Sequence, residues 1–323
     1  MIVVTGGAGF IGSVLLWQLN MQGIEDILVV DNLGTSEKWR NLVKRRYYEY
    51  LSRERFHELL LNDALPKSIS AIVHLGACSS TTERNCDFLL QNNYQYSRDV
   101  CRYALEKGIR CIVASSAATY GNGRLGFSDD PDLIPHLIPL NMYGYSKQLL
   151  DLWLIREKVT HEVLSLKFFN VFGPNEYHTG SMRSVVAKAF EEISAHGRLK
   201  LFRSTVEGIA DGEQKRDFVY VKDCTALMAW LLEEREICGI RNVGTGIARS
   251  FNELAHAVFS ALARPCQIEY VPMPEQIVPN YQSLTCADMS WLASVDCPVD
   301  FVSLERGVED YVIKYLAGPD RYV

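Results

Sequence analysis

Short apolar runs rich in β-branched residues alternate with longer amphipathic stretches through the first half of the chain. The runs that predict strands are 2–5, 26–30, 71–75, 111–115 and 162–168. The stretches with helical periodicity between them include 13–22, 53–62 and 96–107. Strands that alternate with helices are typical of a parallel sheet covered on both faces. The pattern therefore predicts an α/β fold with a doubly wound parallel sheet.

The second half of the chain follows a less regular pattern. Its predicted segments are a loop at 173–181, a helix at 182–196, a polar segment at 204–214, strands at 217–221 and 240–243, and a helix at 224–234. We expect residues 1–170, joined by 215–247, to form one domain. Residues 171–214 and 248–323 are expected to form a smaller C-terminal α/β lobe.

Composition and charge narrow the class of protein. Of 323 residues, 48% are hydrophobic and 22% are charged, which indicates a globular chain rather than a disordered or fibrous one. The net charge is −6 without a basic block, which argues against a nucleic-acid partner. No apolar run approaches the roughly 18 residues that span a bilayer, so we expect no membrane partner. Nine cysteines lie at no metal-ligand spacing, so we expect reduced thiols, a cytoplasmic protein and no metal.

A glycine-rich turn joins the first predicted strand to the first predicted helix. Gly6, Gly9 and Gly12 form G-x-x-G-x-x-G. Without side chains, the backbone N–H groups of such a turn can approach a pyrophosphate at the helix N-terminus. Asp31 ends the second strand about 20 residues later, where an acidic residue typically binds the adenosine ribose. The pattern predicts a dinucleotide site of the Rossmann type.

The residues around Asp31 bear on which dinucleotide binds. A carboxylate alone favours NAD, because it would repel a 2′-phosphate. Lys38 and Arg53 follow, however, and two cations could neutralise that phosphate. The residues therefore favour NADP slightly and leave NAD open.

Three further residues predict proton transfer coupled to redox chemistry. Tyr143 and Lys147 form Tyr-x-x-x-Lys, which places both side chains on one face of a helix. The lysine ammonium, together with a positively charged nicotinamide, is expected to lower the pKa of Tyr143. Ser116 ends a strand and can hydrogen-bond the same substrate oxygen. We expect these residues to move a proton while a hydride passes to the cofactor.

Together these motifs resemble the extended short-chain dehydrogenases/reductases, which include nucleotide-sugar epimerases and dehydratases. Runs at 74–83, 92–97, 115–121 and 215–221 are similar to one branch, the ADP-L-glycero-D-manno-heptose 6-epimerases, and the resemblance covers nearly the whole chain. It implies an isomerase that inverts C6 of an ADP-activated heptose for the lipopolysaccharide core. The inversion would pass through a 6-keto intermediate with bound NADP. The resemblance also implies a homo-oligomer, with a pentamer suggested.

The same resemblance assigns binding residues by position. Those implied to contact the cofactor are Phe10, Ile11, Asp31, Asn32, Lys38, Arg53, Leu75, Gly76, Ala77, Cys78, Ser79, Asn92, Lys147 and Val171. Arg53 stands where the family usually has lysine, which keeps the charge. Those implied to line the substrate are Asn170, Ser181, Lys188, Phe202, Arg203, Ser204, Thr205, Arg216 and Tyr281.

Three other functions are weighed against this one. A UDP-sugar 4-epimerase would share the glycine turn and Tyr-x-x-x-Lys, but it needs a pocket for a uridine nucleotide. A 4,6-dehydratase needs an acid pair near the strand-end serines, where this chain has Ala117 and Ala118. A non-catalytic NADP-binding regulatory protein on the same fold could dispense with Tyr-x-x-x-Lys.

One position departs from the resemblance. The heptose epimerases have a lysine after Glu-x-His, as acid/base on the substrate face opposite Tyr143, and this chain has Thr179 there. A threonine hydroxyl is not a base near neutral pH. Three explanations stay open: His178 has taken the role, Thr179 leaves a binding-competent but slow enzyme, or another group such as Lys188 or a relayed water acts.

Overall fold

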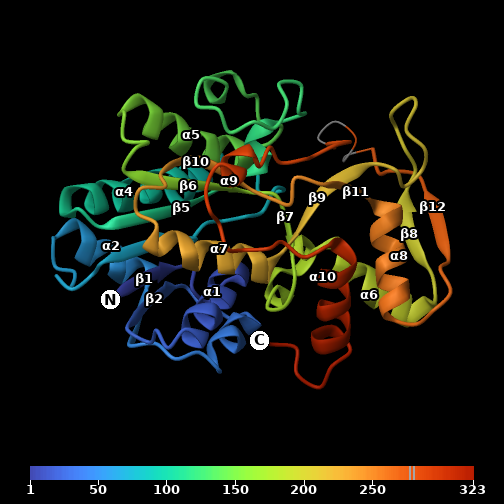
Figure 1. The fold of residues 1–323 in the computed structure, drawn as a ribbon, viewed down its shortest axis with the longest axis horizontal. Helices are drawn as coiled ribbons and strands as arrows, with labels where there is room; N and C mark the ends of the chain where they lie inside the picture. Colours follow the sequence, from blue (N-terminus) through green and yellow to red (C-terminus); the bar gives the residue numbers. More distant parts are fainter. Residues whose placement is uncertain (276–277, 279–280) are drawn as a thin grey trace.

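Seven parallel strands form the central sheet of the computed structural model, which describes residues 1–275, 278 and 281–323 (Figure 1). The strand order is β10-β6-β5-β4-β1-β2-β3. The strands are β1 (Ile2–Thr5), β2 (Ile27–Asp31), β3 (Glu49–Ser52), β4 (Ala71–His74), β5 (Arg110–Ser116), β6 (Val163–Phe168) and β10 (Gly239–Val243). The predicted doubly wound parallel sheet is confirmed.

Helices cover both faces of this sheet (Figure 1). On one face lie α1 (Phe10–Met21) and α7 (Val221–Glu233), and on the other lie α2 (Arg53–Leu61), α4 (Tyr96–Lys107) and α5 (Met142–Arg156). Successive strand residues serve opposite faces, because side chains alternate along a strand. Val4 packs in the core with α1 and α7, whereas Val3 packs in the core with α2, α4 and α5. Both faces of the sheet are therefore apolar, as the continuous apolar runs predicted.

A smaller group of elements lies beside the central sheet, at the right of Figure 1. It comprises a three-stranded sheet, β11 (Ala248–Ser250), β9 (Lys215–Tyr220) and β7 (Asn170–Phe172), and a parallel pair, β8 (Leu199–Phe202) and β12 (Ile268–Val271). Its main helices are α6 (Val185–His196), α8 (Phe251–Ala261) and α10 (Leu304–Asp310), and shorter helices elsewhere are α3 (Cys86–Leu89) and α9 (Ser290–Ala293). The chain returns to the central sheet through β10. The division into a domain of residues 1–170 with 215–247 and a lobe of 171–214 with 248–323 stays a prediction.

Several short strands gave no signal in the sequence. β3 lies at the edge of the central sheet, and its residues are exposed or half-buried, so it carries no apolar run. β12 likewise gave no signal in the sequence, and all of its residues are half-buried. Within the described part of the chain, no helix is long and apolar enough to cross a membrane.

Close backbone contact fixes the turn between β1 and α1. Gly6 has a positive φ of +66°, and a side chain there would place its Cβ 2.7 Å from the backbone nitrogen of Gly76, after β4. A Cβ at Gly12, on α1, would overlap the carbonyl oxygen of Gly6. Glycine is therefore required at both positions to hold the turn against α1 and the loop after β4.

We expect Gly12→Ala to lower the free energy of unfolding by about 1–3 kcal/mol, because the added methyl group forces the turn away from α1. Denaturant unfolding measures the change. Met21→Ala, at the exposed end of the same helix, is the control and should change stability by less than about 0.5 kcal/mol. If the two variants are equally stable, the turn is not fixed by this contact.

Candidate functional site

A cavity of about 650 Å³ lies at the carboxyl edge of the central sheet. The strand order reverses between β1 and β4, so the loops that follow these two strands diverge and leave a crevice. The predicted cofactor residues all line the cavity: Gly6, Gly9, Phe10, Ile11, Gly12, Asp31, Asn32, Lys38, Arg53, Leu75, Gly76, Ala77, Cys78, Ser79, Asn92, Lys147 and Val171. The structure thus brings together residues from segments far apart in the sequence.

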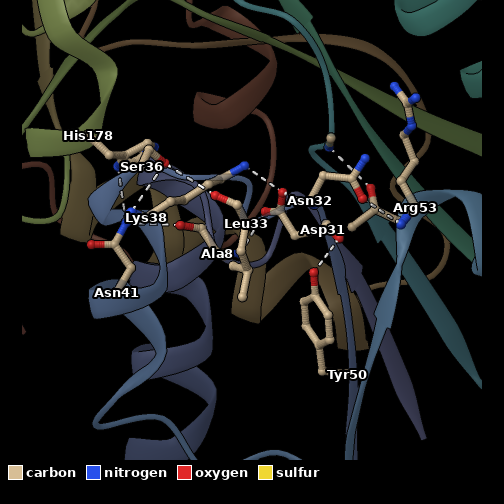
Figure 2. Close-up of polar contacts among 12 residues, drawn as sticks. Ala8, Asp31, Asn32, Leu33, Ser36, Lys38, Asn41, Tyr50, Arg53 and His178 are labelled. Carbon is tan, nitrogen blue, oxygen red and sulfur yellow. Dashed lines mark hydrogen bonds and ion pairs between the residues drawn. The ribbon is translucent and has the colours of Figure 1, made fainter.

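At one end of the cavity, Asp31 is engaged by the protein itself (Figure 2). Its Oδ2 accepts a hydrogen bond from the backbone N–H of Ala8 at 2.9 Å, and its Oδ1 forms an ion pair with Lys38 Nζ at 2.5 Å. The backbone N–H of Asn32 donates to the same Oδ1 at 2.7 Å. Asp31 therefore fastens the glycine turn, and Lys38 neutralises its charge.

Arg53 also lines the cavity, and it contacts Asn32, the residue after Asp31 (Figure 2). Its guanidinium donates to the side-chain oxygens of Asn92 and of Glu54. The backbone N–H of Arg53 donates to Asn32 Oδ1 at 3.0 Å, which ties the start of α2 to the end of β2. Two cations, Lys38 and Arg53, therefore border this end of the cavity.

His178 also lines the cavity, and it contacts Asn41 (Figure 2). Its Nδ1 lies 3.2 Å from Asn41 Nδ2, which also donates to the carbonyl of Ala8 in the glycine turn. Burial, followed by the charge of Lys38, lowers the pKa of His178 to about 4. His178 is therefore neutral near pH 7, and Asn41 links it to the glycine turn. Its role as the second acid/base stays a prediction.

The three predicted proton-transfer residues meet at the end of β5. Tyr143 is hydrogen-bonded to the Ser116 side chain, and Lys147 Nζ donates to the carbonyl of Ala114 at 2.8 Å. Burial lowers the pKa of Lys147 to about 8. Burial raises the pKa of Tyr143, while the hydrogen bond from Ser116 acts in the opposite direction. The expectation that Lys147, together with a positively charged nicotinamide, lowers this pKa stays a prediction, and within the protein itself burial has the largest effect.

A buried chain of hydrogen bonds joins the cofactor loops to the helix that carries Tyr143. His74 Nδ1 contacts Thr5 Oγ1 at 2.6 Å, and its Nε2 contacts Ser97 Oγ at 2.8 Å. Asn93 donates both to the carbonyl of Cys78 and to Ser146 Oγ, at 2.9 and 3.0 Å. Burial lowers the pKa of His74 to about 3, so its imidazole is neutral and serves as a fixed link.

Thr179 stands at the position that departs from the family pattern. It lines the cavity, and its hydroxyl proton is already engaged in a hydrogen bond within the protein. Its Oγ1 donates to the carbonyl of Glu176 at 2.8 Å. The Glu176 carboxylate in turn accepts from Ser184 Oγ at 2.7 Å, and burial raises its pKa. Both residues thus hold the segment from Gly173 to Ser184 in place. Sequence reasoning missed Glu176, because nothing in its spacing distinguishes a buried carboxylate from a surface one.

Among the predicted substrate residues, Asn170 lines the cavity and the others do not. The others form small groups nearby in the sequence and the fold. Lys188 Nζ donates to the carbonyl of Ser181 at 2.6 Å, and the Arg216 guanidinium lies 5.0 Å from the centre of the Tyr281 ring. Phe202, Arg203, Ser204 and Thr205 follow one another at the end of β8. The structure brings Arg216 next to Tyr281 and Lys188 next to Ser181. It does not bring all of the predicted substrate residues to one wall of the cavity.

In the described ranges, no group of three or more His, Cys, Asp or Glu side chains could hold a metal ion. The nine cysteines are free thiols, and Cys101, Cys111 and Cys224 are buried.

Comparison with known proteins gives a consistent result. Residues 2–244 match the model of the NAD dependent epimerase/dehydratase family. The chain is 56% identical over 323 residues to an ADP-L-glycero-D-manno-heptose-6-epimerase of Nitratidesulfovibrio vulgaris, with 100% of both chains covered. It is 45% identical over 332 residues to that of Fusobacterium nucleatum, again with 100% of both covered. The crystal structure of the Helicobacter pylori enzyme of the same name superposes with a TM-score of 0.78 at 26% identity, covering 97% of this chain and 94% of that one.

Proposed function

Because the chain belongs to the NAD dependent epimerase/dehydratase family, and within it to the ADP-L-glycero-D-manno-heptose 6-epimerases, we propose that it inverts C6 of ADP-glycero-manno-heptose. The observation that carries the proposal is the meeting of Ser116, Tyr143 and Lys147 in the same cavity as the glycine turn. The C6 carbon bears an alcohol and no neighbouring carbonyl, so its hydrogen is too weakly acidic for direct removal as a proton. Inversion therefore needs transient oxidation.

The residues of the cavity fit a nicotinamide dinucleotide. Gly6 and Gly12 leave room where any Cβ would collide with backbone, and the N-terminus of α1 faces that space. The glycine turn would hold the pyrophosphate, and Asp31, Lys38 and Arg53 the adenosine end. When bound, the nicotinamide supplies a reversible hydride acceptor, so that C6 passes through a planar 6-keto state without net redox.

Within this arrangement, Tyr143 is the proposed base for the C6 hydroxyl. Its phenol is buried and hydrogen-bonded to Ser116, so a substrate oxygen placed between them would meet both. Because burial raises the pKa of Tyr143, additional positive charge is needed to favour the phenolate. Lys147 supplies part of that charge from within the protein, and the oxidised nicotinamide supplies more.

We propose NADP rather than NAD as the preferred cofactor. A free carboxylate at Asp31 would repel a 2′-phosphate, but Lys38 already neutralises it. Arg53 adds a second cation at the same end of the cavity. The two cations favour a phosphate dianion over a hydroxyl at this position.

The remaining expectations are also proposals. Nine free thiols support a reducing, cytoplasmic location. A homo-oligomer, with a pentamer suggested by the family, is testable by analytical ultracentrifugation.

We expect the double variant Lys38→Ala/Arg53→Ala to weaken NADP binding by about 3–6 kcal/mol, at roughly 1.5–3 kcal/mol per charged contact. NAD binding should barely change, because NAD lacks the 2′-phosphate. Isothermal titration with both cofactors measures the difference. Equal weakening of NADP and NAD would contradict the assignment.

We expect Tyr143→Phe to fold normally and to lower turnover by at least about 10²-fold, because it removes the proton acceptor and keeps the shape of the ring. The rate of interconversion of the two ADP-heptose epimers measures the effect. Tyr145→Phe is the matched control, since Tyr145 is exposed on the same helix. Near-normal epimerisation by Tyr143→Phe would remove Tyr143 from the mechanism.

We expect Thr179→Lys to raise the epimerisation rate by about 10-fold or more, because it restores an acid/base within the range of general catalysis. NADP retention should stay unchanged. Thr179→Met is the control for side-chain length without charge, and His178→Ala tests the alternative. A fast parent enzyme that His178→Ala cripples and Thr179→Lys does not improve would assign the second acid/base to His178.

A further inference from the structure

A fully buried ion pair lies next to the strand end and the helix that carry the proton-transfer residues. Lys167 Nζ, on β6, is 2.6 Å from Asp151 Oδ2, on α5, and both side chains are 0% exposed. Such a pair is costly to bury, because both charges lose their hydration, and it contributes little to stability relative to apolar residues of the same size. Its presence at this place therefore calls for a reason other than stability.

The pair is connected to two residues at the end of β5, Ser115 directly and Ser116 through Thr119. Ser115 Oγ donates to Asp151 Oδ2 at 2.8 Å. Lys167 Nζ donates to Thr119 Oγ1 at 2.7 Å, and Thr119 Oγ1 donates to the carbonyl of Ser116 at 2.8 Å. Immediately before them in the chain, the carbonyl of Ala114 accepts from Lys147. Three consecutive residues of β5 are thus tied to α5 or to its buried ion pair.

The helix side of the arrangement is equally regular. Tyr143, Lys147 and Asp151 follow one another at intervals of four residues, so they share one face of α5. Lys147 is one turn from the Asp151 carboxylate, and the charge of Asp151 favours its ammonium form. Lys167 carries the opposite charge and pairs with the same carboxylate.

We propose that Asp151 and Lys167 are positioning residues for the proton-transfer site: the pair holds the strand end that carries Ser116 against the helix that carries Tyr143 and Lys147, and it sets the net charge that Lys147 faces. The inference rests on the proposed function only in giving Tyr143 and Lys147 their roles. Removing either member of the pair changes the charge near Lys147, and the two changes have opposite signs.

Other titratable groups also lie near Lys147 and the pair. Cys78 favours the ammonium form of Lys147, and the charge of Lys147 helps to keep His74 neutral. The Ser165 hydroxyl donates to Asp151 Oδ1 at 2.8 Å, and the Tyr120 ring lies 5.1 Å from Lys167 Nζ. Burial holds the pKa of Tyr120 above its usual range, so it adds no charge near neutral pH.

The test compares Asp151→Asn, Lys167→Met and the double variant. If loss of the Lys147 ammonium ends activity at high pH, Asp151→Asn should move the alkaline limb of kcat to lower pH by about half a unit or more, and Lys167→Met should move it to higher pH by a similar amount. The double variant should lie between them. Ser165→Ala removes a hydrogen bond to Asp151 without a change of charge, so it should leave the limb in place.

A second readout does not depend on turnover. Nitrogen-15 NMR of Lys147 Nζ, in the wild-type protein and in the Tyr143→Phe background, should show the same opposite shifts of its titration. Lys167→Gln replaces Lys167→Met if the latter fails to fold. Shifts in the same direction for Asp151→Asn and Lys167→Met, or no shift in either, overturn the inference. Failure of the proposed function would appear separately, as normal turnover by Tyr143→Phe with the NMR shifts intact.

Discussion

The close approach of three backbone segments, at Gly6, Gly12 and Gly76, is the constraint on which the rest of the site depends. Side chains at Gly6 or Gly12 would overlap the neighbouring backbone, so the turn after β1 is packed between α1 and the loop after β4. This places free N–H groups at the helix N-terminus, where an anion is favoured. It also fixes the distance from the glycine turn to Asp31, whose carboxylate accepts a hydrogen bond from the backbone N–H of Ala8 in the turn. The position of the cavity end proposed for the adenosine depends on that distance.

Two lysine–aspartate ion pairs lie at or near the cavity, and they differ in how accessible they are. Near the glycine turn, Lys38 pairs with Asp31 at the cavity wall. Lys167 and Asp151, by contrast, are fully buried. The first pair is open to a ligand in the cavity, as the proposed NADP binding requires, whereas the second is enclosed by protein. The same type of ion pair therefore suits the proposed cofactor recognition in one place and the proposed positioning in the other.

The sequence predicted the central sheet and singled out residues that the fold gathers in one cavity, because both depend on local patterns. Buried parallel strands read as apolar runs, and the glycine turn and Tyr-x-x-x-Lys are short motifs with a fixed geometry. Edge strands such as β3 gave no signal, since only one side of them is packed. The polar residues that hold the site, such as Asn93 and Asp151, could not be predicted, because their partners lie far away in the chain and carry no shared spacing. The burial that raises the pKa of Tyr143 likewise could not be predicted from Tyr-x-x-x-Lys.

The two sides of the cavity differ in the side chains they present, and this difference bears directly on the proposed inversion at C6. On the side of α5, Lys147 lies one turn from Asp151 of the buried ion pair. On the side of the Gly173–Ser184 segment, the Thr179 hydroxyl donates to a backbone carbonyl, and Glu176 is held by Ser184. A ketone that turns its other face toward the cofactor then moves its oxygen away from Tyr143, toward groups already satisfied by the protein. In the proposed reaction, proton delivery on that side is therefore the step with the least side-chain support.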